Sequence, residues 1–387
     1  MLLCSSCKKF LHPGKFFIRF KILVMLGRGF GFCLVLANLL TTASYTIVYK
    51  IAQDTYTNKN STWLLNFSNV MEYGVTSCVW ILYALYCRYK PLTEGSVRDW
   101  KKESGLICSW AVFRQMLVIA LCCSCATFIW AVSGPSTPAD VQSLLNTLLV
   151  PYTFLLSMWL LKKRYNWYCK ISAILVVIGT LLGTLTPADA EQKPCYLCYV
   201  MFGLAQFPYA YQYIVTERAF CSGIGLFFLE IYSGWIEVLL TFCFSPLQGW
   251  ILGLLGETQE EYSWKNGWSC FLGQNECGNE AFWWAMALVF ASVTNDIAYL
   301  MLTKFGSATF MSVADGFSIP VVNIFMSARF LGRYREASSS LNLVGALICL
   351  LGMVFWGKGE RQDVLQPSIE IEENLLNSDQ FSLTSES

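Results

Sequence analysis

Long apolar stretches alternate with short polar segments along most of the chain. A helix that crosses the hydrocarbon core of a bilayer needs about 20 mostly apolar residues, and ten stretches approach this length. They run approximately over Phe30–Tyr49, Trp63–Cys87, Leu106–Val132, Val141–Leu161, Tyr168–Leu185, Tyr196–Thr216, Ile224–Phe244, Phe282–Leu302, Ser307–Phe330 and Leu341–Trp356. They lack the strict alternation of a membrane β-barrel, so the pattern predicts helices.

The composition supports the same reading. Of the 387 residues, 55% are hydrophobic and 14% are charged, whereas a soluble domain is about 25% charged. We therefore predict an all-α membrane protein in a lipid bilayer. Its connections are short, except for the two termini and a long non-cytosolic loop at 245–281.

The basic residues indicate an orientation. Placing both termini in the cytosol puts 19 of the 27 Lys and Arg residues on that side, as the positive-inside rule favours. Residues 1–29 then form a basic cytosolic segment, and residues 358–387 form an acidic, disordered cytosolic tail. The net charge of +1 excludes a polybasic nucleic-acid binder.

An internal repeat divides the chain. Arg164 follows Pro151 at the same spacing at which Arg333 follows Pro320, so proline and arginine both recur at one constant offset along the chain. Repeats of this kind are common in transporters. Because each half would contain five spans, an odd number, the second half enters the membrane from the opposite side.

The repeat predicts ten transmembrane helices arranged as two inverted five-helix halves, residues 30–186 and 187–357, around a central cavity. The same offset relates Asn146 to Asp315. Each lies shortly before a helix-perturbing proline, and the symmetry places both near the membrane midplane. We therefore expect these two residues to line the cavity.

Ionisable residues within predicted spans are the next candidates, because each one costs about 2.5 to 3.5 kcal/mol on insertion scales. Acids outnumber bases among them, so a cavity that they line would suit cationic or zwitterionic solutes. Asparagine and glutamine side chains in the spans add hydrogen-bonding groups. The predicted binding residues are Asp315, Asn146, Asp296, Asn295, Glu72, Arg114, Glu237 and Gln142.

Two of these candidates have defined roles to test. Protonation of Asp315 from an acidic compartment would neutralise the cavity, which makes Asp315 the expected proton-coupling residue. Arg114 either grips a solute carboxylate or pairs with Glu72 or Asp296 to hold helices together. The sequence leaves both readings of Arg114 open.

Enzyme chemistry has little support in the sequence. The one histidine, His12, lies outside every apolar stretch, so a histidine-based metal site or catalytic group within the membrane is not expected. The chain contains no P-loop motif for binding ATP. We expect no cofactor and no metal. Asn60, in the sequon Asn-Ser-Thr on the expected non-cytosolic side, is a candidate for glycosylation.

Particular motifs resemble the chloroquine-resistance-transporter-like family of the drug/metabolite transporter superfamily. They are Val141-Gln142-Ser143, Lys162-Lys163-Arg164-Tyr165, Lys265-Asn266-Gly267 and Cys270-Phe271-Leu272-Gly273. The resemblance implies ten helices in two inverted halves, and export of amino acids, peptides, thiol peptides or cationic drugs. It also implies an acidic vacuole or lysosome-like organelle, with a plastid envelope as the alternative location.

The long loop departs from the parasite branch of that family, which has four cysteines there. This loop has only Cys270 and Cys277, so at most one bridge closes within it. By the resemblance, we expect these two cysteines to form a disulfide on the non-cytosolic side. The other cysteines are scattered, many of them in apolar stretches.

The sequence as a whole predicts a monomeric, proton-coupled secondary transporter whose partners are a small solute, protons and lipid. One alternative is a nucleotide-sugar or phosphate-ester antiporter of the same superfamily, which requires converging basic residues. The other is a multi-pass receptor or scaffold that transports nothing.

Overall fold

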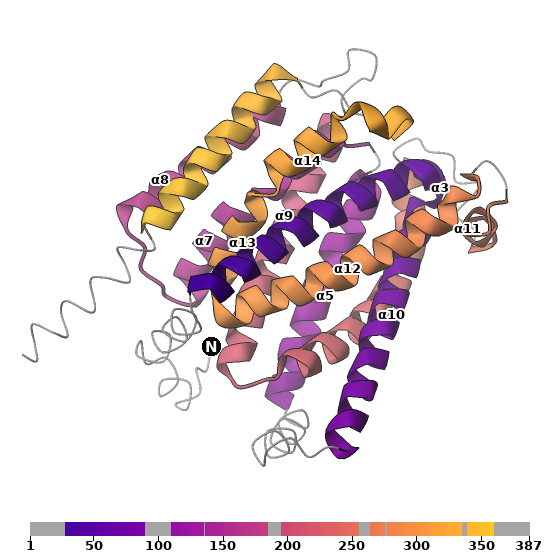
Figure 1. Ribbon diagram of the computed structural model, residues 1–387, viewed down its shortest axis with the longest axis horizontal. Coiled ribbons are helices and arrows are strands. Elements are labelled where there is room, and N and C mark those ends of the chain that lie inside the picture. The colour runs from indigo at the N-terminus through magenta and orange to yellow at the C-terminus, as the bar shows by residue number, and fades with distance from the viewer. Residues whose placement is uncertain are drawn as a thin grey trace, which may run out of the picture.

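The computed structural model describes residues 28–89, 110–134, 136–184, 195–254, 264–274, 277–334 and 339–359. Within these ranges every regular element is a helix, so the all-α prediction is confirmed (Figure 1). The predicted basic segment 1–29 and acidic tail 358–387 lie almost entirely outside the described residues.

The helices follow one another in a simple order. Their bounds are α3 (Arg28–Tyr89), α5 (Trp110–Ser133), α6 (Ala139–Asn146), α7 (Leu149–Leu160), α8 (Trp167–Thr184), α9 (Tyr196–Cys221), α10 (Leu226–Leu254), α11 (Trp264–Phe271), α12 (Glu280–Phe305), α13 (Ala308–Gly316), α14 (Ile319–Met326), the 3₁₀ helix η3 (Arg329–Tyr334) and a last helix, Ser340–Gly359. The long loop expected at 245–281 is therefore partly helical, because α10 continues to Leu254 and α11 lies within it.

Seven segments of the described chain are long and apolar enough to cross a membrane. They are Cys33–Tyr56, Trp110–Ser133, Ala139–Leu160, Trp167–Thr184, Glu280–Phe305, Ala308–Met326 and Ser340–Gly359. The chain is thus a multi-pass membrane protein. By this criterion alone the expected count of ten is not reached, although α9, α10 and the second part of α3 are helical where three further spans were expected.

Helix α3 contains two arms rather than one straight rod. Its Thr42 hydroxyl bonds Asn295, and its Glu72 carboxylate accepts a bond from Ser292, yet the two partners are neighbours on α12. A straight helix would separate residues 42 and 72 by about 45 Å, so α3 must turn back on itself, as its ribbon does in Figure 1. The predicted loop between the first two spans is therefore helical, including the backbone at Asn60, whose side chain is outside the description.

Two predicted spans are broken near their prolines. Helix α6 ends at Asn146 and α7 begins at Leu149, while α13 ends at Gly316 and α14 begins at Ile319. Proline lacks the N–H that would bond four residues back and clashes with that carbonyl, so Pro151 and Pro320 each disrupt the turn before them. The second break lies one position beyond the place to which the repeat offset carries the first.

The last helix packs closely and antiparallel against α8, beside it in Figure 1. A Cβ on Gly345 would lie 2.5 Å from the Gly179 carbonyl oxygen, and one on Gly352 would lie 3.0 Å from the Ser172 carbonyl oxygen. Small residues allow such approach between membrane helices.

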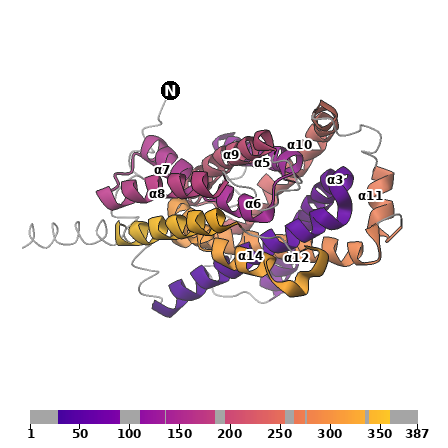
Figure 2. The same cartoon turned by 90° about the horizontal axis from the view of Figure 1, so that it is seen from above.

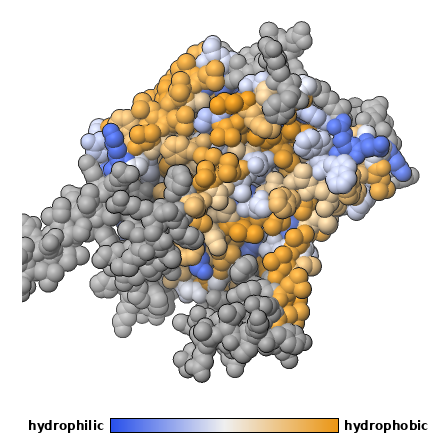
Figure 3. All heavy atoms as spheres, in the orientation of Figure 1, coloured by the Kyte–Doolittle hydropathy of each residue, from blue (hydrophilic) through white to orange (hydrophobic). Residues whose placement is uncertain are grey.

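Several of the remaining helices form two groups. Helix α12 packs along α3, and α5 packs against α9 and α10. Figure 2 shows α5, α9 and α10 on one side, with α12 and α14 on the other. Hydrophobic side chains cover most of the coloured face in Figure 3, and hydrophilic ones gather at the end where α11 lies. This distribution suits a molecule whose sides contact lipid and whose ends contact water.

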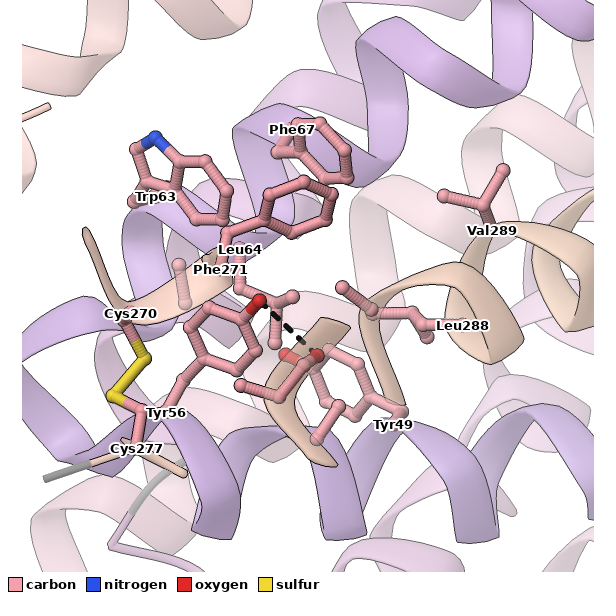
Figure 4. Close-up of a cluster of buried hydrophobic side chains, with 14 residues drawn as sticks. Tyr49, Tyr56, Trp63, Leu64, Phe67, Cys270, Phe271, Cys277, Leu288 and Val289 are labelled. Carbon is pink, nitrogen blue, oxygen red and sulfur yellow. Dashed lines mark hydrogen bonds between the residues drawn. A yellow bond between two sulfur atoms is a disulfide. The ribbon is translucent and has the colours of Figure 1, made fainter. Parts of the chain in front are cut away.

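Helix α11 packs on the bend of α3 through an aromatic cluster, and a disulfide joins its end to the segment before α12 (Figure 4). Trp63 stacks on Phe67 with ring centroids 4.9 Å apart, and Phe271 packs against both rings. Cys270 and Cys277 are joined, so the predicted disulfide is confirmed. A second disulfide, between Cys195 and Cys198, was not expected from the sequence.

An ion pair connects three elements at one end of the bundle. The Lys163 ammonium, between α7 and α8, lies 2.7 Å from a Glu217 carboxylate oxygen of α9. The other Glu217 oxygen accepts the Ala308 N–H at the start of α13. Burial by itself lowers the pKa of Lys163, but the Glu217 carboxylate outweighs it and the pKa is raised, so Lys163 stays charged at neutral pH.

Candidate solute-binding cavity

A cavity of about 150 Å³ lies at the centre of the bundle. Helices α3, α5, α6, α7, α9, α10, α12 and α13 line it, together with both helix breaks. Thr147 lines it at the first break, and Gly316 and Ser318 line it at the second. Because each break leaves backbone groups outside regular helical bonding, the cavity wall is polar where the two breaks meet it.

Seven of the eight predicted binding residues line this cavity. These are Asp315, Asn146, Asp296, Asn295, Glu72, Glu237 and Gln142. The eighth does not: Arg114 is exposed on α5, close to its start, and is not part of the wall. The sequence left open a pairing of Arg114 with Glu72 or Asp296; in the structure Arg114 is exposed, whereas Glu72 is buried in the cavity wall. Arg114 was expected inside a span, but α5 begins only four residues before it.

Asp315 is held by two residues of α3. Its Oδ1 accepts a bond of 2.8 Å from the Asn38 amide and one of 2.9 Å from the Thr42 hydroxyl. Thr42 also lies 3.0 Å from the Asn295 Oδ1, which brings the candidates of α12 and α13 together. Asn38 and Thr42 were not among the predicted residues, although with Thr46 they form a polar stripe at four-residue spacing within an apolar span.

Asn146, which also lines the cavity, has a similar arrangement. Its Oδ1 accepts a bond of 2.9 Å from the Gln206 amide of α9. Gln142, one turn earlier, directs its amide nitrogen to the carbonyl oxygens of Gly134 and Thr137, 2.8 Å away in each case. Gln142 therefore holds the turn before α6, and Asn146 connects α6 to the neighbouring helix α9.

Three carboxylates from three helices converge at another part of the wall. Oxygen atoms of Glu72, Glu230 and Asp296 all lie within 4.8 Å of one another. Like charges this close repel strongly in a poorly hydrated site, so protons or cations are favoured near them. Glu230 lies near the start of α10, and the packing of α10 against α3 and α12 brings it into this group.

The ionisable residues of the described wall are acidic. Its ionisable acids are Glu72, Glu230, Glu237, Asp296 and Asp315, and among the lining residues that the structure describes there is no Lys, Arg or His. The Glu237 carboxylate accepts a bond of 2.8 Å from the Tyr73 hydroxyl. A solute in this cavity therefore meets acids, amides and hydroxyls, but no described basic group.

Aromatic side chains form much of the remaining wall. The lining rings belong to Tyr45, Tyr49, Tyr73, Trp130, Phe202, Tyr209, Tyr213 and Tyr299. Tyr213 and Tyr299 stack with centroids 4.6 Å apart, and Trp130 stacks on Phe202 at 5.4 Å. Aromatic faces attract cations, so these rings and the acids favour the same class of solute. The sequence signal was a pair of tyrosines four residues apart, as at Tyr209 and Tyr213.

Comparison with known proteins agrees with this architecture. The profile of the CRT-like family, described as chloroquine-resistance transporter-like, matches residues 34–356. The chain belongs to the CRT-like family. The match includes the cavity-lining residues, so the resemblance seen in the sequence motifs is confirmed and the chain is a member of a membrane transporter family.

Three relatives from Dictyostelium discoideum are similar to the chain. Crt homolog 2 is 25% identical over 57% of this chain and 53% of its own length. Crt homolog 3 is 25% identical over 58% of this chain and 54% of its own length. Crt homolog 1 is 22% identical over 62% of this chain and 58% of its own length. The chain thus spans a little more than half the length of the curated relatives that it matches.

Proposed function

We propose that the chain is a proton-coupled secondary transporter that exports small cationic or zwitterionic solutes from an acidic organelle by alternating access. Candidate solutes are amino acids, small or thiol peptides and drug-like weak bases. The observation that carries the proposal is the central cavity, whose described wall has five acids and no base, in a chain of the CRT-like family.

The proposal includes two inverted five-helix halves, residues 30–186 and 187–357. Equivalent contacts across the halves support it. Asn146 of the first half is bonded by Gln206 of α9, while Asp315 of the second half is bonded by Asn38 of α3. The separation of the donors Asn38 and Gln206 along the chain is one position short of the repeat offset.

The serines of the two broken helices add a second pair of contacts. Ser143 of α6 donates to the Asn323 side chain of α14 at 3.1 Å. Ser312 of α13, which the repeat offset relates to Ser143, lies 2.8 Å from the Thr153 hydroxyl of α7. Each serine thus bonds the later half of the opposite broken helix, as a two-fold relation requires.

Within this proposal, Asp315, Asp296, Glu72 and Glu237 supply negative charge to the cavity, and Asn295 and Asn146 supply amides. Asp315 is the proposed site of proton coupling. Its neighbours Asn38 and Thr42 place it beside the first helix of the other half, so a change in its charge alters contacts between the halves. Both termini face the cytosol in this arrangement, and the protein acts as a monomer.

Uptake into proteoliposomes under an imposed pH gradient tests the proposal. Labelled amino acids, short peptides and organic cations are compared with a phosphate ester. We expect gradient-driven uptake of the cationic and zwitterionic compounds only, and at least a tenfold loss with Asp315→Asn. Asp54→Asn, on α3 but outside the cavity wall, is the matched control and keeps its uptake.

The alternatives give different results in the same assay. Exchange of the phosphate ester would support an anion antiporter, and no uptake of any compound would support a receptor or scaffold. Uptake that is indifferent to pH and intact in Asp315→Asn would show that the proposed coupling is wrong.

A further inference from the structure

The disulfide that the sequence did not suggest lies at the start of a helix of the cavity wall. Cys195 and Cys198 frame the tetrapeptide Cys-Tyr-Leu-Cys at the first turn of α9, and their sulfur atoms are joined. This spacing is the one found in thiol–disulfide oxidoreductase motifs. The described residues therefore hold two disulfides in different settings.

The two disulfides differ in access. Cys195 is half-buried at the end of its helix, and the intervening Tyr196 and Leu197 are more than half exposed. Cys270, in contrast, is 0% exposed and Cys277 is 6% exposed. Both belong to the aromatic cluster in Figure 4. Cys195 therefore keeps some exposed surface at which a thiol can approach, whereas Cys270 has none.

The local backbone also favours a reduced form of the first pair. Cys195 occupies the N-cap position of α9, and its sulfur accepts a bond of 3.3 Å from the Cys198 N–H. A helix N-terminus stabilises negative charge, so a sulfur anion at Cys195 has a donor already in place. The second pair has no such position, because Cys270 lies in the last turn of α11.

We propose that Cys195 and Cys198 form a thiol–disulfide exchange site that reacts with small thiols, and that Cys270–Cys277 is a structural bridge that does not. The thiolate of a small thiol attacks the Cys195 sulfur and forms a mixed disulfide. The Cys195–Cys198 bond breaks, and its electron pair leaves on the Cys198 sulfur, which takes a proton from water.

A second small thiol completes the reaction. Its thiolate attacks the small-molecule sulfur of the mixed disulfide, and Cys195 leaves as the thiolate that the Cys198 N–H stabilises. The products are two protein thiols and one small-molecule disulfide, so the two electrons gained by the protein come from the two thiols. Oxidation runs by the reverse steps.

The position of the site links this chemistry to the cavity. Phe202, one turn after Cys198, lines the cavity and stacks on Trp130. Tyr199, next to Cys198, packs in a cluster with Val141 and Leu145 of α6. The exchange site thus lies at the outer end of a helix whose next turns form part of the wall.

Equilibration of the purified full chain with 2-mercaptoethanol and its disulfide, followed by alkylation and peptide mass spectrometry, measures both pairs in one sample. We expect Cys195–Cys198 to be half reduced at a value of [thiol]²/[disulfide] at least about tenfold lower than the value needed for Cys270–Cys277. This ratio corresponds to a difference in reduction potential of about 30 mV. The second pair is the internal control.

Trapping the intermediate gives a second measurement. In Cys198→Ser, exposure to the disulfide of 2-mercaptoethanol should place one adduct on Cys195, while Cys277→Ser should leave Cys270 largely unmodified. Equal midpoints for the two pairs, or the absence of a Cys195–Cys198 bond in protein isolated without reductant, would overturn the proposal. These readouts do not involve transport, so they are independent of the proposed function.

Discussion

At the scale of single residues, the cavity depends on short polar side chains that bond polar groups of different helices. Thr42 is the clearest case, because its hydroxyl lies 2.9 Å from Asp315 and 3.0 Å from Asn295. Removing it leaves acceptors on α12 and α13 without this donor. A buried acceptor that loses its partner costs about 1–3 kcal/mol.

The substitution Thr42→Val tests this role, since it keeps the shape of the side chain and removes the hydroxyl. We expect the free energy of unfolding in detergent to fall by about 1–3 kcal/mol, with a lower thermal midpoint. Thr41→Val is the matched control, because the Thr41 hydroxyl bonds a carbonyl of its own helix, that of Asn38. Equal losses in the two variants would mean that Thr42 does not hold Asp315 and Asn295 in place.

At the scale of elements, glycines decide how closely the last helix approaches α8. Gly179 and Gly345 face each other with their backbones in contact, and Cys349 lies beside them. In a bilayer the hydrophobic effect does not drive helices together, so close backbone packing carries much of their association. Enlarging either glycine must push the two helices apart.

The variant Gly345→Ala is expected to lower the free energy of unfolding by about 1–3 kcal/mol, the usual cost of overpacking. The new methyl would meet backbone atoms at 2.5 to 2.8 Å, which cannot rotate away. In the same helix, a Cβ added at Gly357 would have no neighbouring atom within 4 Å. The variant Gly357→Ala should therefore be neutral or slightly stabilising. Thermal unfolding of both variants measures the difference, and similar losses would argue against close packing at Gly345.

At the scale of the whole molecule, the path of the chain through the membrane fixes which side each segment faces. An even number of spans places both termini on one side. We predict that the sequon at Asn60, between the first two spans, faces the other side.

Protease protection in sealed vesicles tests this topology with a tag at each end of the chain. Both tags should be cleaved from the same side, and Asn60 should be modified from the opposite side in cells that glycosylate. Tags on opposite sides would require an odd number of spans and would contradict the two five-helix halves. Asn60→Gln is the control that assigns any glycan to this sequon.

The sequence by itself determined the helical class, the family and the two prolines at which spans break. Hydropathy and proline act within a single segment of the chain, so these features can be predicted without knowing which other helices pack against that segment. The constant offset of the repeat also led to Asn146 and Asp315, which both line the cavity. In addition, the pair Cys270 and Cys277 was found because the family resemblance pointed to that loop.

Only the tertiary structure decided which polar residues meet. A hydropathy pattern says that a segment is apolar, but the rotation and depth of each helix are set by its packing partners. For this reason the sequence could not exclude Arg114, which lies at the exposed start of α5, or include Thr42 and Glu230, which reach the cavity. The five acids belong to four helices, and packing alone brings them to one wall.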